Sequence, residues 1–294
     1  MDQGSFVGGG GLRIFTRSWH PSEGQPRAVV VIVHGFNSHS GYYLGVGEQL
    51  AANGLAVHAL DLRGRGQSEG DRFHVDKGED YVEDVATLVS MAKSYHPGLP
   101  VFLLGHSAGG VIACVYTLDH QDEISGLICE SFALELPAPE LALAVLKGLS
   151  YIIPNAHLVE LENAHFSRDP KVVEAMNNDP LIANEAQPTE TIAALLRAGE
   201  RLMRESSRIT LPLLILHGTL DKATKPSGSQ HFYAMAGSSD KTLKLYEGHY
   251  HDLLNDIDKE VVMADIQQWI DARIPVSSLA EHMTAHQPIA TLQT

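Results

Sequence analysis

The chain holds one serine in a pattern typical of nucleophilic catalysis. Ser107 lies in the pentapeptide Gly105-His106-Ser107-Ala108-Gly109, between an apolar run at 101–104 and a helical pattern at 111–118. A serine on a tight strand-to-helix turn has an exposed hydroxyl, and glycines two residues before and after it let the backbone turn without Cβ clashes. The spacing therefore predicts a nucleophile elbow with Ser107 as the nucleophile, rather than a plain strand-to-helix loop.

Asp221 is the candidate acid that would orient a catalytic base. A serine hydroxyl is a weak nucleophile near neutral pH, so it needs a base, and the base needs an orienting group. Enzymes with this elbow carry the acid and then the histidine on loops after later strands. Asp221 follows the apolar run 213–216, where a helix N-cap is its alternative role. Asp240, in a polar turn, is the weaker rival.

Two histidines compete for the role of the base. His249 and His251 share the loop at 247–252, which follows a predicted strand at 242–246. Either imidazole could reach a serine at the end of the sheet, so the residues alone do not choose between them.

Acyl chemistry also needs N–H donors for the developing oxyanion. Ala108 supplies the N–H that follows the nucleophile, and Phe36 offers a second one from the glycine-bearing loop after the strand at 28–33. His34 and His106 lie beside these turns, where a histidine more often braces a loop through hydrogen bonds than performs catalysis. We therefore expect Phe36 and Ala108 to form the oxyanion hole.

Four segments in this order resemble the monoacylglycerol lipase and lysophospholipase branch of the α/β-hydrolases. They are residues 34–41, the glycine-rich loop 61–70, the elbow, and the loops that carry Asp221 and His251. The resemblance implies a serine hydrolase with His251 as its base, because the family's Gly-x-Tyr-His loop matches residues 248–251. Ala108 replaces the family's usual methionine, which concerns the shape of the pocket rather than the backbone N–H.

The resemblance also implies the α/β-hydrolase fold, with a mostly parallel eight-stranded sheet, helices on both faces and an inserted helical cap. Apolar runs that alternate with helical patterns agree with such a sheet. These runs are 28–33, 56–60, 101–104, 126–129, 213–216 and 242–245. We predict a hydrolase core over 1–131 and 208–274, a helical cap at 132–207 without comparable strands, and a poorly ordered C-terminal tail at 275–294.

The predicted cap contains a stretch at 141–153 that is too apolar for an ordinary surface helix. We expect part of it to line the acyl chain of a substrate, namely Leu143, Leu146, Ile152 and Ile153. A helix buried against the core, or against a second copy of the chain, explains the same pattern, so a homodimer remains an alternative.

The composition limits the classes of partner and cofactor that the sequence predicts. The 294 residues include 36 Asp and Glu against 21 Lys and Arg, a net charge of −15 that argues against nucleic acid. Cys114 and Cys129 indicate reduced core thiols, and the 16 histidines show no metal-ligand spacing, so we expect no metal and no cofactor. The sequence shows no signal peptide pattern and no run of about 18 apolar residues. We therefore expect the protein to lie in the cytoplasm and not to insert stably into a membrane.

The sequence thus predicts a serine carboxylic-ester hydrolase that acts through Ser107, His251, Asp221 and an acyl-enzyme. Its expected substrate is a small-molecule ester with an acyl chain, most simply a monoacylglycerol. An acyltransferase, a thioesterase or a peptidase with the same triad is the alternative within enzymes. A hydrolase-fold binding or receptor protein with weak turnover is the alternative outside them.

Overall fold

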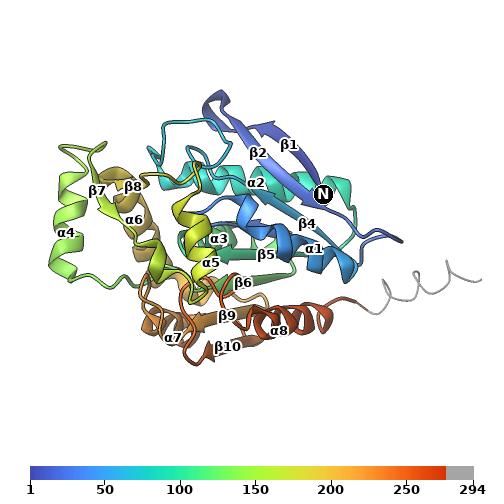
Figure 1. Ribbon diagram of the computed structural model, residues 1–294. Coiled ribbons are helices and arrows are strands. Elements are labelled where there is room, and N and C mark those ends of the chain that lie inside the picture. The colour runs from blue at the N-terminus through green and yellow to red at the C-terminus, as the bar shows by residue number, and fades with distance from the viewer. Residues whose placement is uncertain (276–294) are drawn as a thin grey trace, which may run out of the picture.

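The computed structural model describes residues 1–275, and its centre is one eight-stranded sheet (Figure 1). The strand order is β1-β2-β4-β3-β5-β6-β9-β10. β1 pairs antiparallel with β2, and β2 pairs antiparallel with β4, whereas all neighbours from β4 to β10 are parallel. The predicted mostly parallel eight-stranded sheet is confirmed.

The strands are β1 (Asp2–Val7), β2 (Arg13–Trp19), β3 (Ala28–Val33), β4 (Leu55–Leu60), β5 (Val101–His106), β6 (Gly126–Glu130), β7 (His157–Glu160), β8 (Ala186–Pro188), β9 (Leu213–Gly218) and β10 (Lys241–Tyr246). The α-helices are α1 (Leu44–Ala52), α2 (Gly78–Tyr95), α3 (Ala108–His120), α4 (Glu140–Leu149), α5 (Pro170–Asn177), α6 (Thr189–Glu205), α7 (Pro226–Met235) and α8 (Lys259–Asp271).

Helices cover both faces of the sheet because its central strands are apolar on both sides. All six residues of β3 are buried, as expected for a parallel strand between two helical layers. Alternate side chains point to opposite faces: Val29 and Val31 join a core with α2, α3 and α7, whereas Val30 and Ile32 join a second core with α1 and α8. The two cores hold the carboxyl ends of the parallel strands in fixed register.

The chain between β6 and β9 leaves the main sheet and adds no strand to it. It forms α4, α5, α6 and a two-stranded antiparallel pair of β7 and β8, which Figure 1 shows gathered at one end of the sheet. This segment, residues 132–207, is called the insertion below. It contacts the loops of the core, since the Asp252 N–H donates to the Phe166 carbonyl at 2.8 Å and the Asn37 N–H donates to Glu185 Oε1 at 2.8 Å.

Two features differ from the sequence-based expectation. Residues 2–7 form the edge strand β1, although their polar sequence gives no strand pattern. The insertion is also not purely helical, because β7 and β8 pair within it. β1 is mostly exposed and β7 and β8 are short, so backbone pairing rather than a buried apolar face defines these three strands. The predicted C-terminal tail lies outside the described residues, except for Pro275.

Candidate active site

Ser107 occupies the tight turn between β5 and α3. Its φ of 55° and ψ of −122° are a strained conformation for a residue with a side chain. The turn is held because the Ser107 N–H donates to the Glu130 carbonyl at 3.0 Å and the Gly110 N–H donates to the Ser107 carbonyl at 3.0 Å. At Gly109 a Cβ would lie 2.3 Å from the Val33 carbonyl oxygen, so only glycine lets α3 start this close to β3. The predicted elbow geometry is present.

His251 and Asp221 form a buried pair beside this turn. His251 Nδ1 lies 2.8 Å from Asp221 Oδ2, and both side chains are fully buried. Because a carboxylate only accepts, Nδ1 is the protonated nitrogen and Nε2 carries the lone pair. Nε2 is buried and has no hydrogen-bond partner among residues 1–275. The His251 ring lies 4.8 Å, between centroids, from the ring of His106, the residue before Ser107.

The Asp221 carboxylate receives several donors. The Ala223 and Thr224 N–H groups donate to Oδ1 at 2.8 and 2.9 Å, and the Thr224 hydroxyl donates to Oδ2 at 2.8 Å. His217 Nε2 lies 3.0 Å from Oδ2. Burial by itself would raise the pKa of Asp221, but attraction to His251 and the hydrogen bonds from His217 and His251 hold it well below its usual range. Asp221 is therefore a fixed negative charge behind His251.

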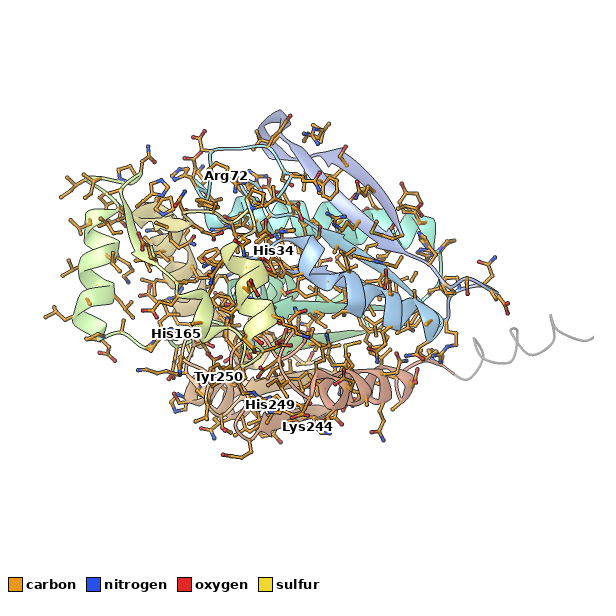
Figure 2. All side chains as sticks on the ribbon, in the orientation of Figure 1. His34, Arg72, His165, Lys244, His249 and Tyr250 are labelled. Carbon is orange, nitrogen blue, oxygen red and sulfur yellow. The ribbon has the colours of Figure 1, made fainter. Side chains whose placement is uncertain are left out.

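The two rival residues lie elsewhere. His249 Nδ1 contacts the Glu247 carbonyl at 3.2 Å, and its ring packs on Tyr246 at 5.5 Å between centroids. Figure 2 labels His249 beside Lys244, well away from His34 near the centre of the view. Asp240 precedes β10 and binds Arg273 through Nε at 3.0 Å, at the opposite end of that strand from His251. Neither rival joins the arrangement around Ser107.

Phe36 lies on the loop after β3 and Ala108 follows Ser107 directly, so both residues lie close to the serine. A Cβ at Gly35 would lie 2.7 Å from the Ser107 Cβ, so the loop that carries Phe36 lies directly against the elbow. Ala108 is the first residue of α3, where helical N–H groups lack a partner within the helix. Among the described residues, neither N–H has a hydrogen-bond acceptor. Both N–H groups are thus uncommitted within residues 1–275.

His34 has the bracing role that the sequence predicts. Its Nδ1 donates to the Gly35 carbonyl at 2.6 Å, and its Nε2 accepts from the Leu62 N–H at 2.9 Å. Burial lowers the pKa of His34 to about 4, so it is neutral near pH 7 and supports the Phe36 loop. His106 differs, because neither of its ring nitrogens has a well-formed hydrogen bond within residues 1–275.

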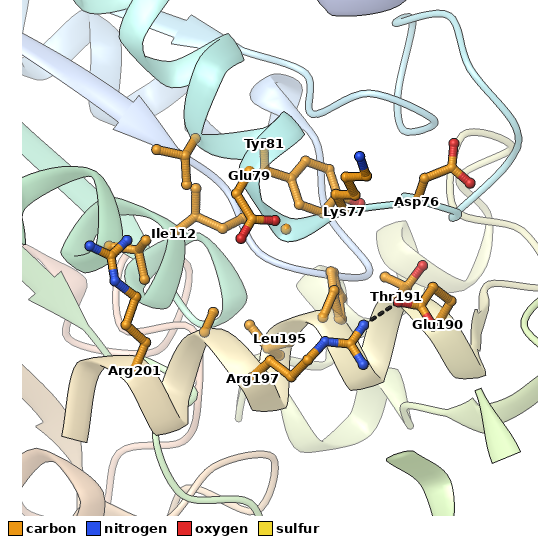
Figure 3. Close-up of a pocket in the computed structure, with 16 residues that line it drawn as sticks. Asp76, Lys77, Glu79, Tyr81, Ile112, Glu190, Thr191, Leu195, Arg197 and Arg201 are labelled. Atoms are coloured by element: carbon orange, nitrogen blue, oxygen red, sulfur yellow. Dashed lines mark hydrogen bonds and ion pairs between the residues drawn. The ribbon is translucent and has the colours of Figure 1, made fainter. Parts of the chain in front are cut away.

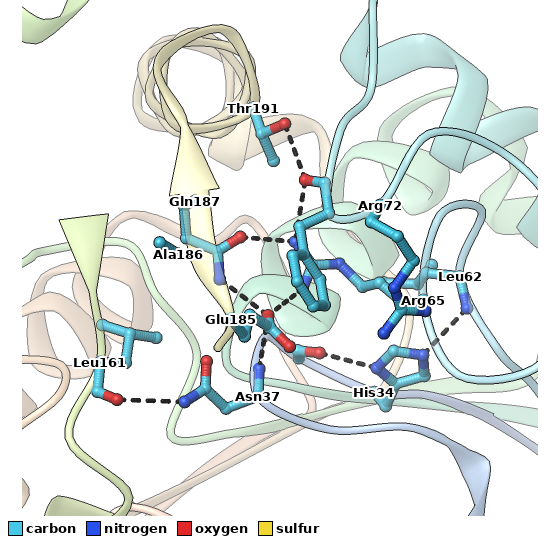
Figure 4. A network of polar contacts seen from close by, with 12 residues as sticks. His34, Asn37, Leu62, Arg65, Arg72, Leu161, Glu185, Ala186, Gln187 and Thr191 are labelled. Atoms are coloured by element: carbon cyan, nitrogen blue, oxygen red, sulfur yellow. Dashed lines mark hydrogen bonds and ion pairs between the residues drawn. The ribbon is translucent and has the colours of Figure 1, made fainter. Parts of the chain in front are cut away.

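A buried polar network joins the insertion to the Phe36 loop (Figure 4). The Arg65 guanidinium pairs with Glu185, donates to Gln187 Oε1 at 2.6 Å, and lies 4.0 Å above the Phe36 ring. Glu185 Oε1 also accepts from the Gln187 amide at 2.7 Å. The insertion and the loop that follows β3 are therefore held as one unit. Sequence reasoning missed this network because its members are far apart in the chain.

Two cavities flank Leu195 of α6. One, of about 490 Å³, lies between α4 and α6 and is lined in part by Ala133, Leu134 and Leu143. The other, of about 250 Å³, lies between α2, α3 and α6 and is bordered by Phe36, with the Arg197–Glu190 ion pair at its side (Figure 3).

The cavity beside Leu143 is linked to the elbow through Ala133, whose N–H donates to the Ser107 carbonyl at 3.0 Å, but Ser107 itself does not line it. Of the other predicted acyl-chain residues, Leu146 packs on the core that contains α3, whereas Ile152 is 77% exposed and Ile153 is 42% exposed. The structure thus does not bring the four residues into one cavity.

Residues 24–258 match the family described as serine aminopeptidase, S33. The monoacylglycerol lipase of Mycolicibacterium smegmatis is 36% identical over 90% of this chain and 95% of its own. The human monoglyceride lipase is 34% identical over 95% and 94% of the two chains. The crystal structure of Paleococcus ferrophilus monoacylglycerol lipase superposes with a TM-score of 0.80, at 30% identity, over 88% of this chain and 99% of the other.

No helix within residues 1–275 combines the length and the apolar character that crossing a membrane requires. With its sheet topology, its elbow and these relatives, the chain belongs to the monoacylglycerol lipase family of α/β-hydrolases and is a hydrolase of the lipase and esterase type.

Proposed function

We propose that this protein hydrolyses carboxylic esters of the monoacylglycerol type through a triad of Ser107, His251 and Asp221. One observation carries the proposal: His251 bonds Asp221 through Nδ1 at 2.8 Å and keeps Nε2 unpaired, next to the strained turn of Ser107. A neutral imidazole held in this tautomer is ready to accept the serine proton.

The steps follow from this arrangement. Ser107 Oγ attacks the ester carbonyl carbon while its proton moves to His251 Nε2, and the N–H groups of Phe36 and Ala108 bind the oxyanion. The tetrahedral intermediate then breaks its ester C–O bond, and the leaving alcohol takes the proton from His251. A water molecule attacks the acyl-enzyme with His251 as base, which releases the carboxylic acid and restores Ser107.

The cavity of about 490 Å³ between α4 and α6 is the site that we assign to the acyl chain. Its position supports this role, because Ala133 both lines it and bonds the Ser107 backbone. In this proposal the insertion acts as a cap, and Leu143 forms part of the acyl wall. Ile152 and Ile153 do not line this cavity.

The test is hydrolysis of p-nitrophenyl esters of increasing chain length, together with monoacylglycerols, with Ser107→Ala as the blank. Wild-type turnover should exceed that of the variant by about 10⁶-fold, as in a serine protease that loses its nucleophile. Circular dichroism should show that the variant is folded. Turnover retained by the folded variant would exclude the mechanism.

The family description names an aminopeptidase, so amide hydrolysis is the second candidate. Amino-acid p-nitroanilides in the same panel separate the two activities. A higher kcat/KM for the anilides than for the esters would assign this protein to peptide substrates.

A further inference from the structure

Glu130 connects the two halves of the proposed triad. It is the last residue of β6, is fully buried and is the only charged residue of that strand. Its backbone carbonyl accepts from the Ser107 N–H at 3.0 Å, and its Oε1 accepts from the Leu253 N–H at 2.7 Å. Because Leu253 lies two residues after His251, one residue holds both the nucleophile turn and the histidine loop.

The Glu130 carboxylate belongs to a buried cluster of ionisable side chains. Ligand-type atoms of His106, Glu130 and Asp252 all lie within 4.8 Å of one another. Glu130 Oε2 and both ring nitrogens of His106 lack a hydrogen bond of good geometry among the described residues, although the Leu254 backbone interacts with Glu130 and the His251 backbone with His106. The Asp252 carboxylate accepts from the Asn255 side-chain amide, at 3.0 and 3.2 Å, and from the Asn255 backbone N–H. Within residues 1–275, no Lys or Arg forms an ion pair with either carboxylate.

Two carboxylates this close in a buried place cannot both be ionised without a cation. Burial and then the charge of Asp252 raise the pKa of Glu130 well above its usual range, and burial also raises the pKa of Asp252. A proton on Glu130 Oε2 would turn an unsatisfied acceptor into a donor toward Asp252.

We propose that Glu130 and Asp252 share one proton at neutral pH, and that Glu130 is a positioning residue that holds the Ser107 turn and the His251 loop together. The inference rests on the proposed function, since it concerns the same Ser107 and His251. The pair then carries one negative charge rather than two. Together with Asp221, this charge stabilises the imidazolium form of His251 during the reaction.

Other titratable groups near the pair come from several elements. His106 lies on β5, and burial keeps its pKa well below the ordinary value, so it is neutral. Asp221 and Asp256 are the neighbouring carboxylates, and Asp256 is paired with Arg168 at 2.8 Å. Tyr43 and Tyr246 also face the pair, and burial raises the pKa of both phenols, so they are neutral too. Substitution of Glu130 and Asp252 therefore removes the one negative charge that the pair shares, and leaves the charges of the neighbouring groups unchanged.

The experiment measures kcat/KM against pH for Glu130→Gln, Asp252→Asn and the double variant, on the best ester from the panel above. Protonation of His251 stops its action as a base, so activity falls on the acid side, and a nearby negative charge moves that fall to higher pH. Each single variant still leaves one ionised carboxylate. The acid side should therefore move by less than about 0.3 pH unit in each single variant, and toward lower pH by about 0.5–1 unit in the double variant.

Additive shifts would overturn proton sharing. If both carboxylates were ionised, each single variant would already move the acid side, and the double variant would add the two effects. A bound divalent cation would overturn it too, and native mass spectrometry of the purified protein would show that cation at one equivalent. Glu247→Gln is the matched control, an exposed glutamate near His251 whose substitution should leave the profile in place.

The positioning role has its own readout. Glu130→Ala removes the bond to Leu253 and should lower kcat by about 100-fold with KM changed less than threefold, while Glu130→Gln should restore most of the loss. Equal kcat in the Ala and Gln variants would overturn the positioning role. If Glu130→Ala does not fold, the pH profiles of Glu130→Gln, Asp252→Asn and the double variant still test whether the two carboxylates share a proton. Retained turnover in Ser107→Ala would instead refute the proposed function itself.

Discussion

Asp221 shows most clearly how a single residue acts in this site. Its carboxylate is enclosed by donors, and its contact with His251 fixes which imidazole nitrogen holds the proton. Asp221→Asn would replace this acceptor with an amide and favour the wrong tautomer of His251. By analogy with a measured triad, kcat should fall by about 10³–10⁴-fold at neutral pH.

The matched control is Asp240→Asn, since Asp240 was the rival acid and its half-exposed carboxylate pairs with Arg273 at the far end of β10. It should change kcat by less than twofold. A large loss for Asp240→Asn, or a small one for Asp221→Asn, in steady-state kinetics would reverse the assignment.

For single residues, the sequence predicts a role where a local pattern points to it. Ser107 is predicted from its elbow, and Asp221 from its place after a buried strand. His217 and Glu130 are not found, because their roles depend on neighbours from other parts of the chain. A polar residue at the end of an apolar strand, as Glu130 is after 126–129, is the one signal that could have revealed it.

Among the elements, β4 contains a buried histidine that costs stability. His58 is 5% exposed, its Nε2 has no hydrogen-bond partner among residues 1–275, and its ring stacks on Tyr95. Burial, together with the charges of His96 and His20, lowers the pKa of His58 to about 3. His58 therefore stays unprotonated in the folded protein at pH values where the unfolded chain binds a proton there. The free energy of unfolding thus falls as the pH drops from about 6.5 toward 3.

His58→Leu should remove this cost. The melting temperature should rise at pH 7, because an unsatisfied buried nitrogen is lost, a gain of about 1–3 kcal/mol. The advantage over the wild type should grow by about 2 kcal/mol at pH 5, since the depressed pKa no longer applies. Thermal unfolding at both pH values measures this, with His165→Leu on the insertion as control. An advantage that does not grow at low pH would contradict the explanation.

The elements themselves were predictable where apolar runs are buried. The runs at 28–33, 101–104 and 213–216 correspond to β3, β5 and β9, because strands between two helical layers need apolar side chains on both faces. β1 was missed because it is a polar edge strand, stabilised by backbone pairing with β2. β7 and β8 were missed because they form a short pair of their own within the insertion.

For the whole molecule, the position of the insertion on the core determines the space for a substrate. The cavity between α4 and α6 includes Gly199, where an added Cβ would meet only Leu134 at 3.9 Å. Gly199→Phe should fill part of this space, lower kcat/KM for long-chain esters by about tenfold or more, and leave short-chain esters nearly unchanged. The measurement is the same ester panel, as a function of chain length.

Gly148→Phe is the matched control, because Gly148 lies on α4 with open space around it and does not line the cavity. It should leave the chain-length preference as in the wild type. Equal effects of the two variants would place the acyl chain elsewhere. Sequence patterns could not locate this cavity, because it depends on how the insertion packs through contacts such as Arg65 with Glu185.

The measurement that tests the central claim most directly is covalent labelling with a fluorophosphonate, followed by peptide mass spectrometry. The reagent reacts with a serine only when a base activates it. The proposed mechanism predicts one equivalent of label on Ser107, loss of esterase activity in step with labelling, and much slower labelling of His251→Ala. Label on another residue, or full activity after Ser107 is labelled, would contradict it.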